Sequence, residues 1–350
     1  MTTARPVEAG LVCPVCRTAL RAPDPARLVC ATCDREFPVL LGIPDLRIAP
    51  DPYIGIEADR AKGMELAERY QGLDFEQTVD LYYSMTSVVP PLQATLFKRG
   101  LLAGPARARA ALESWEAAAG VVDPSGMQLL EVGCGTAPLL SVAAGRYRGV
   151  VGVDIAFRWL VVARKRLEEA GLDVPLVCAC AEALPFDPER FDCVVLDSVL
   201  EHLADAGAAL DECRRVTVPG AALYLTTPNR FSLGPDPHAG VWAGGWWPDR
   251  LIARYVARRG GIPPRRRLLS APGVRRRLRQ SGFAQVRLYP PRIPPDQRAR
   301  FDGFKRVLID GYGLARRLPM VRGLLLGLGP LIAGVARRNA SRRDPLDAGP

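Results

Sequence analysis

Residues able to bind a ligand lie where a short apolar run breaks into glycines. Leu129, Leu130 and Val132 give residues 128–132 a short apolar, β-prone character, and Gly133 and Gly135 follow them. Glycines let a backbone turn sharply and approach a ligand without a Cβ in the way. A second apolar run, residues 149–153, ends in Asp154, 19 residues after Gly135. An acid at that spacing after a glycine loop is typical of a carboxylate that binds the hydroxyls of a ribose.

Four cysteines near the amino terminus form a second set with ligand chemistry. Cys13 and Cys16 make one Cys-x-x-Cys pair and Cys30 and Cys33 another, with 13 residues between the inner cysteines. Four thiolates at this spacing can surround zinc tetrahedrally, and a site without an open position is structural. The alternative is a pair of disulfides or free thiols. We expect zinc, and we expect chelators to unfold only the segment that ends near Leu46.

The elements that must position the glycine loop alternate between strand and helix. Strands are expected at residues 128–132, 149–153, 174–178, 191–196 and 221–227, and helices at 139–144, 157–170 and 200–216. This alternation predicts an α/β fold with a doubly wound, mostly parallel sheet. In such sheets the ligand binds at the carboxyl ends of the strands, which is where the glycines and Asp154 fall.

These motifs resemble those of class I methyltransferases that use S-adenosylmethionine, in the broad group that contains ubiquinone-type and other small-molecule methyltransferases. The resemblance covers residues 123–230 and rests on four segments: Glu131-Val-Gly-Cys-Gly-Thr, Asp154, residues 181–186 and residues 200–203. It implies a Rossmann-like sheet and an S-adenosylmethionine site. The cofactor-binding residues that it implies are Glu131, Gly133, Cys134, Gly135, Asp154, Ile155, Cys180, Ala181, Glu182 and Asp197. A nicotinamide dehydrogenase would want a third glycine at position 138, where this chain has proline.

Two positions depart from the usual pattern of this family. Family members often have glycine where Ala137 stands, and alanine is small enough to replace it. The residue before Ala181 is commonly an aspartate that accepts the adenine amino group, whereas here it is Cys180, and a thiol is a weak acceptor. Adenine is then held by backbone groups of Ala181 or by Glu182, or cofactor affinity is reduced. A chain that binds the cofactor without catalysis is an open alternative.

The cysteine segment also resembles a known module. With the turns Phe37-Pro and Gly42-Ile-Pro, residues 11–46 resemble the small zinc-ribbon proteins that act as activator subunits of tRNA, rRNA and protein methyltransferases. The resemblance implies a structural zinc and leaves open what the ribbon contacts.

The chain has only two histidines, and both follow strands of the expected sheet. His202 comes just after the fourth strand, and His238 lies in a proline-rich loop followed by Trp242, Trp246 and Trp247. Each could remove a proton from an acceptor, and we take both as candidate catalytic residues. The alternatives are that His202 braces its loop by a hydrogen bond and that the tryptophans only pack on the surface.

We divide the 350 residues into a zinc ribbon (1–48), a helical connector (49–122), a cofactor-binding domain (123–290, with a substrate loop at 231–262) and a C-terminal segment (291–350). Residues 251–350 hold 23 Lys and Arg against 5 Asp and Glu, whereas the first 250 hold 24 against 32. The excess of basic residues in 251–350 indicates binding to an anionic partner or, alternatively, a solvated arginine-rich surface. Residues 314–336 read as an apolar helix, either docked on the protein or lying in a membrane interface.

Three functions remain open from the sequence. The first is methyl transfer to an oxygen or carbon of a small or lipid-like acceptor. The second is methylation of rRNA or tRNA, with the ribbon and the arginines as RNA contacts; against it, no aromatic side chains interleave the arginine triplets. The third is a non-catalytic binding protein. The nine cysteines and the lack of a visible export signal favour the cytoplasm, with a membrane-peripheral location as a further interpretation.

Overall fold

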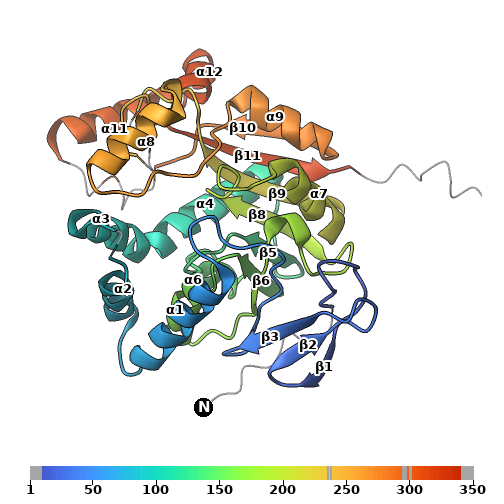
Figure 1. Cartoon of the computed structure of the whole chain (residues 1–350). Helices are drawn as coiled ribbons and strands as arrows, with labels where there is room; N and C mark the ends of the chain where they lie inside the picture. Colours follow the sequence, from blue (N-terminus) through green and yellow to red (C-terminus); the bar gives the residue numbers. More distant parts are fainter. Residues whose placement is uncertain are drawn as a thin grey trace, which may run out of the picture.

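A seven-stranded sheet in the order β10-β11-β9-β8-β5-β6-β7 forms the centre of the protein (Figure 1). The computed structural model describes residues 10–339 except 88, 235, 237–238, 294–297 and 299–301. The strands are β5 (Gln128–Val132), β6 (Gly149–Asp154), β7 (Leu176–Cys178), β8 (Phe191–Asp197), β9 (Thr217–Pro228), β10 (Phe283–Tyr289) and β11 (Leu331–Arg338). β5 to β9 pair in parallel, and β11 runs antiparallel to β9 and β10. The expected mostly parallel α/β sheet is confirmed.

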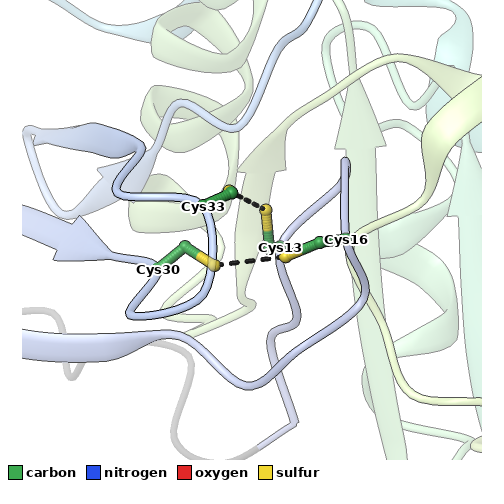
Figure 2. A group of neighbouring side chains, drawn as sticks. All are labelled: Cys13, Cys16, Cys30 and Cys33. Carbon is green, nitrogen blue, oxygen red and sulfur yellow. Dashed lines mark hydrogen bonds between the residues drawn. The ribbon is translucent and has the colours of Figure 1, made fainter.

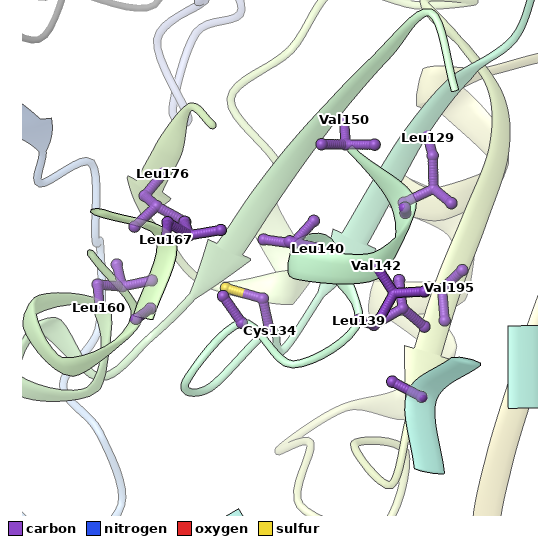
Figure 3. Close-up of a cluster of buried hydrophobic side chains, with 14 of the residues drawn as sticks. Leu129, Cys134, Leu139, Leu140, Val142, Val150, Leu160, Leu167, Leu176 and Val195 are labelled. Carbon is purple, nitrogen blue, oxygen red and sulfur yellow. The ribbon is translucent and has the colours of Figure 1, made fainter. Parts of the chain in front are cut away.

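Helices cover both faces of the sheet. They are α1 (Ile56–Arg69), α2 (Phe75–Ser84), α3 (Pro91–Leu102), α4 (Gly104–Ala119), α5 (Leu140–Ala143), α6 (Phe157–Glu169), α7 (Ala206–Val216), α8 (Asp249–Arg258), α9 (Ala271–Gln280), α11 (Gly303–Ala315) and α12 (Pro319–Leu328). Along β5 successive side chains alternate between the faces, so Leu129 belongs to one buried cluster and Leu130 to the other. Figure 3 shows part of the first cluster, where Leu160 and Leu167 of α6 lie near the sheet.

The amino-terminal ribbon is a small antiparallel sheet that packs on the other face. Its strands are β1 (Arg21–Asp24), β2 (Arg27–Val29), β3 (Glu36–Leu40) and β4 (Ile43–Pro44). Leu28, Phe37 and Leu46 belong to the same buried cluster as the inner side chains of β7, β8 and β9. The Leu46 amide donates to the Cys178 carbonyl at 2.7 Å, and the Val12 amide to the Pro185 carbonyl at 3.0 Å. The ribbon therefore shares a core with the sheet, although the domain boundaries given above stay predictions.

One expected helix is wrong over its C-terminal part, from residue 329 onward. Residues 314–336 contain the end of α11 and all of α12, but β11 begins at Leu331 and pairs along its length with β9. Gly329 and Pro330 end α12, because proline cannot continue a helix. Ile332 and Val335 are β-branched and are 0% and 2% exposed between two neighbouring strands. Residues 331–336 of the apolar run are therefore a sheet strand, and the docked and membrane interpretations can apply only to α12.

Smaller differences concern element ends. The helix expected from residue 200 begins at Ala206, because the Asp205 carboxylate caps it by accepting from the Gly207 and Ala208 amides at 2.8 and 3.1 Å. α5 has only four residues, so the helix after the glycine loop is one turn long. Within the described part of the chain, no helix is both long and apolar enough to cross a membrane.

Candidate active site

The glycine loop after β5 has the geometry that its sequence predicts. Gly133 has a φ of +74°, and a Cβ there would lie 2.3 Å from Cγ2 of Val199, so only glycine fits. Gly135, with a φ of +51°, donates its amide to Asp154 Oδ2 at 2.8 Å, which joins the loop to the end of β6. Asp154 Oδ1 accepts the Ala156 amide at 2.8 Å. A carboxylate has about four lone-pair positions, so Asp154 keeps acceptor capacity for ribose hydroxyls.

Three carboxylates from neighbouring strands converge at this edge of the sheet. Glu131 is 3% exposed, and its Oε2 has no hydrogen-bond partner among the described residues. Burial raises the pKa of Glu131 well above its usual value, and the nearby charges of Asp197 and Asp154 raise it further. Burial also raises the pKa of Asp154 and of Asp197. Hydrogen bonds from two backbone amides to Asp154, and from the Thr226 hydroxyl to Asp197, lower these pKa values but do not outweigh burial. Carboxylates held this close favour a cationic ligand.

The remaining predicted cofactor residues divide between backbone and side-chain roles. Cys134 is 2% exposed and its thiol packs in the core beside Leu140, so only its backbone faces the loop. The Ile155 carbonyl accepts from the Arg47 guanidinium at 3.0 Å. Sequence reasoning missed Arg47, because nothing in the motif around it points to the cofactor loop.

The adenine-loop residues are held by other parts of the chain. The Cys180 thiol donates to the Ala49 carbonyl at 3.6 Å, and the 3₁₀ turn η1 (Ala181–Ala183) follows it. Glu182 Oε1 accepts the amides of Ala204 and Asp205 at 3.0 and 3.2 Å, which joins the adenine loop to the start of α7. Binding of adenine by Ala181 or Glu182 stays a prediction.

A cavity of about 770 Å³ opens beside Asp197. α4, the carboxyl ends of β8 and β9, the start of β11, and α11 surround it, and most of its lining is apolar. Trp115, Trp242, Ile293, Leu308 and Ala333 supply apolar surface. The polar side chains in the lining include those of Asp197, Ser198, Glu201, Thr226, Arg107 and Arg292. An apolar cavity with a few convergent polar groups is the usual form of a small-molecule site.

Comparison with known proteins agrees with this geometry. The family described as "Methyltransferase domain" matches residues 130–225, which run from β5 into β9. The chain carries a methyltransferase domain. The expected resemblance to S-adenosylmethionine-dependent methyltransferases is therefore confirmed.

Curated relatives match about a third of this chain. A ubiquinone biosynthesis O-methyltransferase of Cereibacter sphaeroides is 36% identical over 129 residues, which is 37% of this chain and 51% of the relative. The protein of the same name from Pseudomonas entomophila is 36% identical over 110 residues, 31% of this chain and 47% of its own. The chain thus spans about half the length of the curated relatives it matches.

Solved structures are more distant. Phosphoethanolamine N-methyltransferase 2 of Haemonchus contortus, solved with phosphomonomethylethanolamine and S-adenosylhomocysteine, has a TM-score of 0.45 and 20% identity, covering 67% of this chain and 52% of its own. A chain from the complex of the Haloferax volcanii Trm112 methyltransferase activator with a putative methyltransferase has a TM-score of 0.42 and 15% identity, covering 67% of this chain and 94% of its own.

The predicted catalytic residues of the methyltransferase domain stay predictions. The His202 imidazole is half-exposed, with Nε2 3.9 Å from Glu201 Oε1, and does not line the cavity. His238 lies outside the described residues. Glu201 is 1% exposed, lines the cavity, and accepts the Thr227 hydroxyl through Oε2 at 3.0 Å. Sequence reasoning missed Glu201 as a candidate base, although it stands beside His202 in the same motif.

The four amino-terminal cysteines come together as expected (Figure 2). Their sulfurs all lie within 4.8 Å of one another, with 3.6 Å between Cys13 and Cys33 and 3.3 Å between Cys16 and Cys30. All nine cysteines of the chain are free thiols, so the disulfide alternative is excluded in this structure. Zn–S bonds of about 2.3 Å put tetrahedral sulfurs about 3.8 Å apart. The cluster therefore fits one zinc ion with small shifts.

Proposed function

We propose that this protein transfers a methyl group from S-adenosylmethionine to an oxygen, or a carbon, of a small or lipid-like acceptor. The observation that carries this proposal is the convergence of Glu131, Asp154 and Asp197 at the carboxyl ends of the strands, with Asp197 also lining a largely apolar cavity. A matching methyltransferase domain supports the reaction type.

The carboxylates suit this cofactor because it is cationic. S-adenosylmethionine supplies a methyl group already activated for displacement by its sulfonium charge, so the protein must mainly bind, orient and exclude water. Asp154 would accept the ribose hydroxyls, and Glu131 and Asp197 would face the positively charged end. Gly135 leaves space for the ligand beside the loop, because nothing lies within 4 Å of the place where its Cβ would be.

The cavity lining favours an acceptor with a substantial apolar body. Trp115, Trp242 and Leu308 can bury such a body, while Asp197 and Glu201 mark the polar end where methyl transfer would occur. The relatives named ubiquinone biosynthesis O-methyltransferases support an oxygen acceptor. Glu201 would accept the hydroxyl proton of the acceptor, with His202 and His238 as the other candidate bases.

Isotope labelling identifies the acceptor directly. Cell extract incubated with the protein and S-adenosylmethionine labelled in its methyl group should yield a labelled small or lipid-soluble product, identified by mass spectrometry. Glu201→Gln should lower kcat by roughly 10²- to 10⁴-fold if Glu201 is the base. Label in the RNA fraction, with a steep salt dependence, would favour the RNA alternative. No product and no cofactor binding would leave the non-catalytic alternative.

We also propose that α12 holds the protein against an anionic membrane surface, where a lipid-like acceptor resides. α12 has the sequence Pro-Met-Val-Arg-Gly-Leu-Leu-Leu-Gly-Leu, yet none of its residues is buried. Met320 is 93% exposed and Leu324 59% exposed. Arg322 of α12 is exposed, and so is Arg317 in the turn that precedes this helix. Exposed apolar side chains flanked by arginines fit the interface of an anionic bilayer.

Liposome flotation tests this membrane contact. The full chain should float with anionic vesicles and less with neutral ones, since each arginine near the surface contributes about 1 kcal/mol. Met320→Glu with Leu324→Glu should abolish flotation. Val122→Glu, which changes a residue 98% exposed in the connection from α4 to β5, is the matched control and should float normally. Equal flotation of both variants, or none by the wild type, contradicts the proposal.

A further inference from the structure

A buried ion cluster joins the cysteine ribbon to the loop that follows β6. The Arg47 guanidinium is fully buried and pairs with Asp45 Oδ2 at 2.6 Å and with Asp59 Oδ2 at 2.7 Å. The same guanidinium donates to the Ile155 carbonyl at 3.0 Å. Ile155 directly follows Asp154, the predicted ribose acid. A residue at the exit of the ribbon therefore contacts the backbone next to the cofactor site.

The cluster also fixes the start of α6. Asp59, which is on α1, accepts the Phe157 amide at 2.7 Å and pairs with the Arg158 guanidinium at 2.6 Å. The N-cap residue Ala156 has no side chain able to cap the helix, so Asp59 satisfies an amide that would otherwise lack a partner. Arg158 pairs in addition with Asp51 at 3.3 Å. Residues 155–158 are thus held from one side by Arg47 and Asp59.

The other end of the cluster is fastened to the ribbon sheet. The Asp45 amide donates to the Pro38 carbonyl of β3 at 2.9 Å, and Leu46 donates to Cys178. Three residues later the Ala49 carbonyl accepts the Cys180 thiol. Residues 45–49 therefore run from the ribbon along the carboxyl ends of β6 and β7, where the ribose and adenine would lie.

Arg47 can act on the cofactor only through this backbone. Asp154 binds a ribose well only if residues 154–156 keep their geometry, and small displacements of a binding group cost affinity. If Arg47 is lost, Asp45 keeps Arg60 at 2.7 Å and Asp59 keeps Arg158 at 2.6 Å, so each buried carboxylate loses one of its two cations. The Ile155 carbonyl loses its contact with the guanidinium, and the link from residues 45–47 to the start of α6 is broken.

We propose that the cysteine ribbon positions the ribose-binding loop through Arg47, so that metal binding at the cysteine cluster sets cofactor affinity. Arg47 is then a positioning residue. This inference rests on the proposed function, because it needs a cofactor at Asp154.

Calorimetric titration with S-adenosylhomocysteine tests the link to Arg47. Arg47→Met should weaken binding by about 5- to 150-fold, the usual range for coupling between two sites, and Arg47→Lys should weaken it less. The matched control is Arg338→Met. Arg338 is 9% exposed and binds Glu189 at 2.7 Å and the Thr217 carbonyl, at the opposite edge of the sheet. The Arg338→Met substitution should lower the Tm but change the affinity for S-adenosylhomocysteine by less than about twofold.

Metal removal tests the link to the ribbon. Wild-type protein freed of zinc by a chelator should lose affinity to a similar extent, and metal-free Arg47→Met should lose no more than Arg47→Met alone, because both changes act through one contact. Native-like far-UV circular dichroism establishes that each form is folded. If Arg47→Met does not fold, Arg47→Lys takes its place, and hydrogen exchange at the Phe157 and Arg158 amides is measured as well. We expect these amides to exchange faster in Arg47→Lys than in the wild type.

The outcomes separate the two proposals. If metal-free protein or the Arg47 variants bind S-adenosylhomocysteine as tightly as the metal-loaded wild type, the positioning role is wrong. If the metal-loaded wild type does not bind it at all, the proposed function fails instead.

Discussion

Asp154→Ala should weaken the binding of S-adenosylhomocysteine by about 1.5–3 kcal/mol, or roughly 10- to 150-fold. The substitution removes the predicted acceptor for the ribose hydroxyls. It also removes the carboxylate that holds the Gly135 and Ala156 amides, so the glycine loop loses its link to β6. Calorimetric titration measures the loss.

Asp192→Ala is the matched control for this experiment. Asp192 Oδ2 accepts the Gln128 amide at 2.7 Å near the start of β8, at the amino ends of the same strands. The control should therefore keep its affinity for S-adenosylhomocysteine. Equal affinity in Asp154→Ala and the wild type would remove Asp154 from the cofactor site.

The affinity for S-adenosylhomocysteine should depend on pH because of the same carboxylates. Burial raises the pKa of Glu131 and of Asp154 above the unfolded value of about 4. Cofactor binding needs the charged forms, so affinity should fall as pH drops through the raised pKa values. The stability of the ligand-free protein should change in the opposite direction. The stabilisation that these two groups contribute is fully present below about pH 4, and it is lost as pH rises through their raised pKa values in the folded state.

The sequence predicted the glycine turn and the strand that ends in Asp154 well because the signals for both are local. Gly133 and Gly135 are required by positive φ angles, and Asp154 lies at the end of the neighbouring strand. Each of these features is set within one strand–turn unit. The four cysteines are a similar case, because two short motifs determine the cluster.

The C-terminal region was harder because its pattern is ambiguous. An apolar run with two glycines and a proline reads as a broken helix, and only pairing with β9 and β10 shows that residues 331–338 form a strand. β9 and β11 are far apart in sequence, so no local signal reports their pairing. Periodicity alone cannot separate a buried strand from a buried helix.

The ion cluster and the cavity depend on contacts between distant segments. Arg47 reads as an ordinary charged residue until Asp59, 12 residues away, and Ile155, 108 residues away, are placed around it. Glu201 likewise becomes a candidate base only in the folded structure, where the Thr227 hydroxyl donates to its carboxylate and orients it beside the cavity. Tertiary contacts of this kind have no sequence pattern to identify them.

Protein purified without chelators should hold one zinc ion per chain, and Cys30→Ala should remove it. Metal binding contributes about 10–16 kcal/mol to folding in small zinc modules, which is comparable with the whole stability of a domain. Elemental analysis gives the zinc content. Cys213→Ala, at a buried thiol of α7 outside the cluster, should keep its zinc.

The sequence suggested that chelation would unfold only the segment that ends near Leu46, but the shared core changes this expectation. Leu28, Phe37 and Leu46 pack with the inner face of the sheet, and Leu46 is 0% exposed. Loss of the ribbon would uncover Val177 and Phe186, which are now buried. We therefore expect chelation to lower the Tm of the methyltransferase domain as well, measured by near-UV circular dichroism of its tryptophans. An unchanged melting curve for the sheet, with the ribbon unfolded, would show that the two parts fold independently.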